Sequence, residues 1–179
     1  MTYGIHDAIL ERLQAFLQDA LIDNITGPDD AKAGVVKIGP LQGDPEPDDA
    51  RISVEIYGND PLSDETADEG EDQIVEVECG GACTWSRKFT LRVRLLFDRT
   101  RETLDECREI TSTVKERIEI ALLKENFVGI ASGNEYVSRG PLAGNMRIKT
   151  HQGGGPPDSF DFRITITFDV LTTRTGVFS

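Results

Sequence analysis

Two long stretches that alternate apolar and polar side chains constrain the fold of this chain more than any other feature. Residues 84–97 and 160–170 each place large apolar side chains at every second position: Phe89, Leu91, Val93, Leu95 and Phe97 in the first, and Phe160, Phe162, Ile164, Ile166, Phe168 and Val170 in the second. Successive side chains of a β-strand point to opposite faces of the sheet. Each stretch therefore predicts a long strand with one buried face and one polar face.

Shorter strands are expected at residues 33–38, 51–57, 73–78 and 146–150. Apolar residues spaced three and four apart predict a helix over residues 5–22 and a longer one near residues 104–122. Thr103 and Glu106 form a capping-box pattern for the second helix, although a start near Thr100 fits the sequence equally well. Residues 129–141, rich in glycine, are expected to be a long connection.

The order of these elements predicts the class of fold. The strands cluster along the chain and do not alternate strictly with helices, which favours an α+β fold. We expect a largely antiparallel β-sheet of four to six strands with two α-helices packed on one face. The length of 179 residues is typical of one domain, so residues 1–179 are expected to form a single domain.

The negative charge of the chain is concentrated in one loop-rich segment, residues 44–78. The chain has 32 acidic and 19 basic residues, a formal net charge of −13, and this segment holds 14 of the acidic residues but only one basic residue, Arg51. The rest of the chain is therefore balanced, with 18 residues of each sign. This distribution excludes a globally basic nucleic-acid binder. Residues 58–72 contain few apolar side chains and are expected to be a mobile loop.

No apolar run approaches the length of about 18 residues that a membrane span needs, and the N-terminus lacks the pattern of a signal peptide. We therefore expect a protein that is made and assembled in a cytoplasm and has no membrane partner. Three cysteines, an odd number, do not suggest a disulfide framework in that compartment.

We find no pattern of residues that predicts catalysis. Cys79 and Cys83 flank a turn, but the other candidate metal ligands, Cys107, His6 and His151, lack ligand spacing. The acidic loop does not match a calcium-binding EF-hand, although weak binding of divalent cations remains open. The glycine clusters lack the Lys-Ser/Thr that follows a phosphate-binding loop. We expect no catalytic residue, no metal site, no cofactor and no enzymatic activity.

The arrangement of elements along the chain resembles a known family. A helix at residues 5–22, a strand ending in Ile56-Tyr57-Gly58, a strand at 89–97, a helix that follows Thr100-Arg101-Glu102 and a last strand at 160–170 resemble the tail-terminator and neck proteins of tailed bacteriophages. The resemblance covers nearly the whole chain and lies in topology, not in a motif. The segment 44–78 is longer and more acidic than a minimal member requires.

The resemblance implies a structural protein of the virion, located at the neck or tail end. It implies a homo-oligomeric ring, usually hexameric, that caps the tail tube, joins it to the head-side connector and lets DNA pass without specific binding. The expected partners are the tail tube protein and the head–tail connector proteins.

Two sets of residues are candidates for contacts in such a ring. Subunits related by rotation meet through two different surfaces, and the polar faces of the two long strands, through edge pairing of strands, are candidates for these surfaces: Lys88, Arg92, Arg94, Arg163, Thr165 and Thr167. The acidic loop supplies candidates for lining the lumen or docking on a basic partner ring: Asp64, Glu65, Asp68, Glu69, Glu71 and Asp72. An anionic lumen would repel DNA and let it slide.

The alternative is an acidic DNA mimic, an inhibitor that occupies the basic site of a nucleic-acid enzyme. Mimicry requires rigidly spaced carboxylates, whereas the acidic residues of this chain are confined to one segment that includes a loop. A ring-sized particle in solution would favour the terminator, and a stable monomer or dimer that blocks DNA binding by another protein would favour the mimic.

Overall fold

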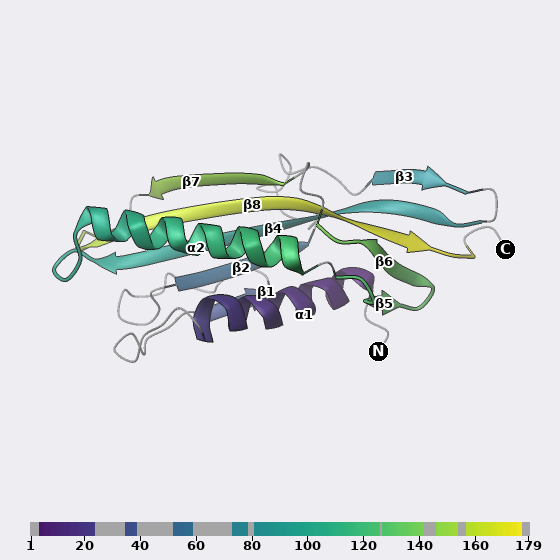
Figure 1. The fold of residues 1–179 in the computed structure, drawn as a ribbon, viewed down its shortest axis with the longest axis horizontal. Coiled ribbons are helices and arrows are strands. Elements are labelled where there is room, and N and C mark those ends of the chain that lie inside the picture. Colours follow the sequence, from purple (N-terminus) through teal and green to yellow (C-terminus); the bar gives the residue numbers. More distant parts are fainter. Residues whose placement is uncertain are drawn as a thin grey trace.

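Two antiparallel strands of sixteen residues each, β4 (Cys83–Asp98) and β8 (Ser159–Arg174), form the centre of the molecule (Figure 1). The computed structural model describes residues 4–23, 35–38, 52–58, 73–78, 81–125, 127–141, 146–153 and 157–176. Cys83 lies opposite Arg174 and Asp98 opposite Ser159, so the two strands pair along their whole length. Both strands extend beyond the alternating stretches that predicted them.

Shorter strands flank this central pair, and different strands do so at its two ends. Beside β4 lie β2 (Ile52–Gly58) at one end and β3 (Gln73–Val77) at the other. Beside β8 lie β7 (Arg147–Gly153) and β6 (Glu135–Arg139). β1 (Val35–Ile38) pairs with β2 in parallel, and β5 (Ala131–Ser132) pairs with β6. The sheet of the described residues therefore has eight strands, with one parallel pair.

Two helices cover one face of the sheet (Figure 1). α1 (Ile5–Leu17), which continues into a π-helical segment at Gln18–Asp23, packs on β1, β2 and β5. α2 (Leu104–Lys124) packs on β8 and on that π-helical segment. This confirms the predicted α+β fold with a largely antiparallel sheet and two helices.

The hydrophobic core lies between the helices and the apolar faces of β4 and β8. Phe89 stacks on Phe168 with ring centroids 5.7 Å apart, and Phe97 meets Phe162 edge-on at 6.0 Å. Each of these pairs joins positions that are opposite or diagonal on neighbouring strands, where large side chains pack best. The side chains that predicted the two strands thus form the core.

The start of α2 resolves the alternative that the sequence left open. Thr103 is the N-cap: its hydroxyl accepts a hydrogen bond from the N–H of Glu106, while the Glu106 carboxylate accepts from the N–H of Thr103 at 2.8 Å. The hydrogen bonds that the N–H and the hydroxyl of Thr103 donate to the carboxylate hold the pKa of Glu106 below its ordinary value. Thr100 instead binds Asp98 in the turn that precedes the helix.

The segment 129–141, expected to be a connection, contains the strands β5 and β6. Its glycines Gly129 and Gly133 have positive φ and form the turns beside these strands.

The loop expected at residues 58–72 lies outside the described residues, apart from Gly58, which ends β2.

Candidate functional site on the sheet

The face of the sheet that the helices do not cover carries the six predicted interface residues. β4 positions 88, 90, 92 and 94 lie opposite β8 positions 169, 167, 165 and 163. Because alternate residues share a face, all six candidates lie together on what we call the outer face. The set comprises Lys88, Arg92, Arg94, Arg163, Thr165 and Thr167.

Much of the charge on the outer face is paired within the subunit. Lys88 forms an ion pair with Asp169 at 3.1 Å, and Arg94 and Arg163 both bind Asp161 at 3.0 Å. The two aspartates are buried, although they lie on the polar face of the two strands. The long basic side chains hydrogen-bonded to these carboxylates provide the physical reason.

Asp161 is the most strongly enclosed carboxylate of this face, with a fully buried side chain. Burial raises its pKa, but hydrogen bonds from Arg163 and Arg94, together with their positive charges, lower it by more. The net result is a pKa below the ordinary value, so Asp161 is ionised at neutral pH. It therefore fixes two arginines of the outer face in position.

The sequence suggests that the two central strands contact a neighbouring subunit by edge pairing. Over most of their length this is impossible, because other strands of the same subunit already pair with them. β2 and β3 already occupy the free side of β4, and β6 and β7 occupy that of β8. The six candidates are therefore residues of a face and not of an edge. The edges open to a neighbour belong to the flanking strands.

β3 is one of these edges, and it exposes apolar side chains. The side chains of Ile74, Val75 and Val77 are 53%, 52% and 56% exposed. β3 lies beyond the end of α2 (Figure 1), and among the described residues no strand pairs with its outer edge. Soluble proteins avoid or cover exposed apolar edges because such edges pair with other chains.

The faces of β3 differ in character. Ile74 lies opposite Trp85, and Val77 opposite Cys83, so both lie on the helix side of the sheet. Gln73 and Glu76 lie opposite Ser86 and Thr84, on the outer face. A bulge between Ile74 and Glu76 leaves Val75 without a partner on β4. By alternation, Glu78 follows Glu76 on the outer face.

β7 is the other long edge, and it is basic. Arg147, Lys149 and His151 lie opposite Thr167, Thr165 and Arg163, so they extend the outer face. All three are exposed, and within the part of the chain that the structure describes no ion pair engages Arg147 or Lys149. Ile148 and Thr150 alternate with them on the helix side. The alternation in residues 147–150 was the sequence signal for this edge.

The outer face is consequently basic. Along β4, β8 and β7 this face carries six Lys or Arg side chains and three Asp side chains. Basic side chains therefore predominate on this part of the outer face, although the net charge of the chain is −13. On β3 the same face carries the acidic Glu76.

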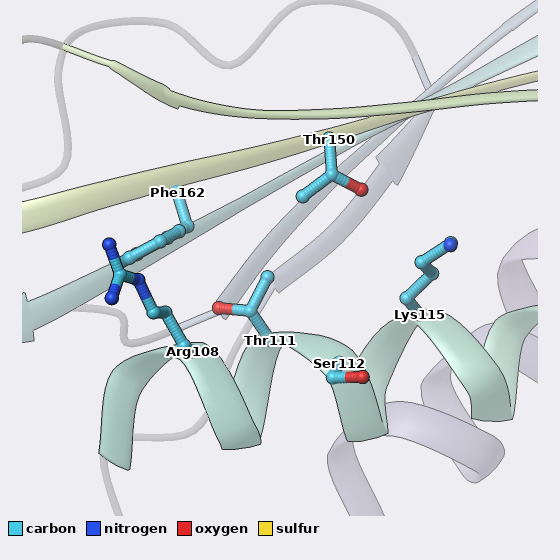
Figure 2. Close-up of a pocket in the computed structure, with 6 residues that line it drawn as sticks. All are labelled: Arg108, Thr111, Ser112, Lys115, Thr150 and Phe162. Atoms are coloured by element: carbon cyan, nitrogen blue, oxygen red, sulfur yellow. The ribbon is translucent and has the colours of Figure 1, made fainter. Parts of the chain in front are cut away.

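An open pocket lies beside β7 on the helix side of the sheet (Figure 2). Its volume is about 240 Å³, and Thr150 points from β7 toward α2, while Arg108 and Lys115 extend from α2 toward the sheet. Thr111, Ser112 and Phe162 complete the lining. The pocket thus lies between α2 and the edge of β7.

A buried polar network on the helix side was missed by the sequence analysis. Glu135 of β6 accepts hydrogen bonds from Arg87 at 2.8 Å and from Thr172 at 2.6 Å, and the Arg87 guanidinium lies over Trp85 at 4.6 Å. The network ties β6 to both central strands. Glu135 lies in the segment expected to be a connection, so no sequence pattern marked it.

The remaining candidates carry no site among the described residues. Cys83 and Cys107 are buried thiols outside any disulfide, Cys79 lies outside the described residues, and no described group of His, Cys, Asp or Glu is arranged to hold a metal ion. The predicted lumen residues also lie outside the described residues: Asp64, Glu65, Asp68, Glu69, Glu71 and Asp72.

No protein-family model and no curated protein matches the chain. Within the described residues, no helix is both long and apolar enough to cross a membrane.

Proposed function

We propose that the protein is a structural subunit of a tailed-phage virion that assembles into a homo-oligomeric ring. The ring acts as a tail terminator or neck ring, joins the tail tube to the head-side connector and surrounds the path of the DNA. The observation that carries the assembling role is β3, an edge strand with three apolar side chains more than half exposed. A surface of this kind is stabilised when another chain covers it.

The shape of the sheet supports a ring subunit. β3 pairs with β4 and β7 with β8, so they are two different edges of the sheet, and they lie near opposite ends of the central strand pair (Figure 1). Contacts between two different surfaces are heterologous, and heterologous contacts close into rings when the rotation between subunits allows it. The fold class is also the one implied by the resemblance to tail-terminator and neck proteins.

The distribution of charge supports a passage for DNA. A channel lined by the basic outer face would bind phosphates and hold the DNA. The proposed ring therefore turns its outer face away from the channel, and the acidic loop at residues 59–72 lines the channel or docks on a basic partner ring. In either position the seven carboxylates of this loop keep the genome from adhering.

Electron microscopy tests this proposal. Purified protein, alone and mixed with purified tail tubes, is examined by negative stain, and its mass is measured by light scattering after size exclusion. We expect closed rings with a central channel that bind one end of the tube. A protein that forms no ring, binds no tube end and instead blocks DNA binding by a nucleic-acid enzyme would refute the proposal and favour a DNA mimic.

A further inference from the structure

We infer that β3 of one subunit adds to the edge of β7 of a second copy of this chain as an antiparallel strand. The inference rests on the proposed ring for its symmetry, and it names the two surfaces that meet. It makes one continuous sheet from neighbouring subunits. The basic edge, β7, is thus covered by the acidic and apolar edge, β3, of a second copy of the same chain.

The direction of pairing follows from the topology. β3 is antiparallel to β4, β4 is antiparallel to β8, and β7 is antiparallel to β8. β7 therefore runs parallel to β4 and antiparallel to β3. Rotation about the ring axis preserves the component of each strand's direction along that axis, so β3 of one copy meets β7 of the next in antiparallel orientation.

The faces also match. A cyclic ring presents the same face of every subunit to its channel, so the helix side of one subunit continues into the helix side of the next. On this side β3 carries Ile74 and Val77, and β7 carries Ile148 and Thr150. The pocket between α2 and β7 leaves room for the apolar side chains of the added strand (Figure 2).

On the outer face the charges are complementary. β3 contributes Glu76, followed by Glu78, and β7 contributes Arg147 and Lys149. In an antiparallel register that places Val77 opposite Ile148, Glu76 lies opposite Lys149 and Glu78 opposite Arg147. Opposite charges directly across a strand pair stabilise it, and like charges destabilise it. Pairing of β3 with a second β3 would place acidic residues together.

Charge exchange between the two edges tests this pairing. One variant, E76K/E78K, makes both edges basic, and a second, R147E/K149E, makes both edges acidic. Each alone is expected to associate at least about tenfold more weakly than the native protein, because every contact then joins like charges. An equimolar mixture is expected to restore association, since an alternating ring pairs every basic edge with an acidic one.

Matched controls separate this effect from net charge and from misfolding. E109K/E116K, on exposed positions of α2, changes the net charge as E76K/E78K does and is expected to associate like the native protein. R139E/K124E, also at exposed positions, is the control for R147E/K149E. Circular dichroism melts of all variants identify any that fail to fold. For such a variant, the same comparison is made with the milder substitutions E76Q/E78Q and R147Q/K149Q.

A disulfide trap tests the register. E76C/K149C, in a C79S background, is expected to form a ladder of covalent oligomers under mild oxidation, whereas E76C/T113C is not; native Cys83 and Cys107 are buried. Rings that survive both charge variants, or a mixture that assembles no better than its parts, would overturn the pairing but leave the ring intact. The pairing would also be overturned if the native protein stays monomeric and the E76C/K149C variant forms no disulfide ladder. If the mixture assembles as expected but the particles bind no tail tube, the pairing stands and the proposed virion role fails.

Discussion

The buried carboxylate of Asp161 holds two arginines of the outer face in position. Asp161 accepts hydrogen bonds from Arg94 on the neighbouring strand and from Arg163 two positions along its own strand. The side chains of Arg94 and Arg163 remain 19% and 44% exposed, so each keeps part of its charge available to solvent or to a neighbour. An ionised group without water must be paired, and here the pairing also sets the direction of the arginines.

Replacing Asp161 by Asn should reveal this role. We expect D161N to lower the free energy of unfolding by about 2 kcal/mol at pH 7, because charge-assisted hydrogen bonds are lost at a buried site. The folded-state pKa lies below the unfolded value, so the contribution is complete above about pH 4 and is lost as the pH falls through the folded-state pKa. Urea unfolding of both proteins between pH 7 and pH 2.5 measures the difference.

The exposed neighbour Asp158 provides the control for this experiment. D158N should change the unfolding free energy by less than about 0.5 kcal/mol at any of these pH values. If the difference between the native protein and D161N is as large at pH 2.5 as at pH 7, the carboxylate does not stabilise the fold through its charge.

At the scale of elements, the cap of α2 decides between two starts that the sequence left equal. The Thr103 side chain caps the helix, and Thr100 does not. T103A should therefore lower the unfolding free energy by about 1 kcal/mol, the usual cost of losing an N-cap. T100A is the matched control and should cost less, because it removes only contacts to Asp98 in an exposed turn. Thermal or chemical unfolding measures both, and equal losses would contradict the assignment.

The elements show which parts of the fold a sequence can predict. The strands at 84–97 and 160–170 and the cap at Thr103 depend on local patterns, and the structure confirms them. β5 and β6 escaped prediction because β6 pairs with β8, more than thirty residues away, and their stretch contains glycines and little alternation. Local pattern does not report such distant pairing.

The candidate site was predictable only in part, for a related reason. Alternation places Lys88, Arg92, Arg94, Arg163, Thr165 and Thr167 on one face, and the structure agrees. It does not say that Asp169 binds Lys88 or that Asp161 binds Arg94, because both pairs form across strands. Nor does an apolar face on β3 reveal whether a helix of the same chain or another subunit covers it. That distinction required the position of β3 relative to α2 (Figure 1).

At the scale of the whole molecule, the position of the edges limits how a ring would close. β3 pairs with β4 at residues 83–86, whereas β7 pairs with β8 opposite β4 residues near 90–96. The two edges are thus offset along the strands by about eight residues, or roughly 27 Å. A sheet with such an offset closes only if its strands are tilted from the axis, as in any barrel. We therefore expect strands inclined to the ring axis.

The last prediction concerns four residues of the acidic loop, Asp68, Glu69, Glu71 and Asp72, whose charge should matter for DNA and not for ring formation. D68K/E69K/E71K/D72K raises the formal net charge by eight, from −13 to −5. The ring should still form, because its proposed contacts lie on β3 and β7. It should, however, retain double-stranded DNA at about 50 mM salt and release it near 200 mM, as phosphate contacts do.

A second variant carries the same change of charge at exposed positions on helices and a turn: E11K/E109K/E116K/D158K. Fluorescence anisotropy with labelled DNA, on rings whose size has been checked by light scattering, compares the two. If the acidic segment faces the DNA path, only reversal within that segment creates retention, since those positions alone lie next to the duplex. Equal retention by both variants would mean that total charge, and not the place of the segment in the ring, governs how DNA passes.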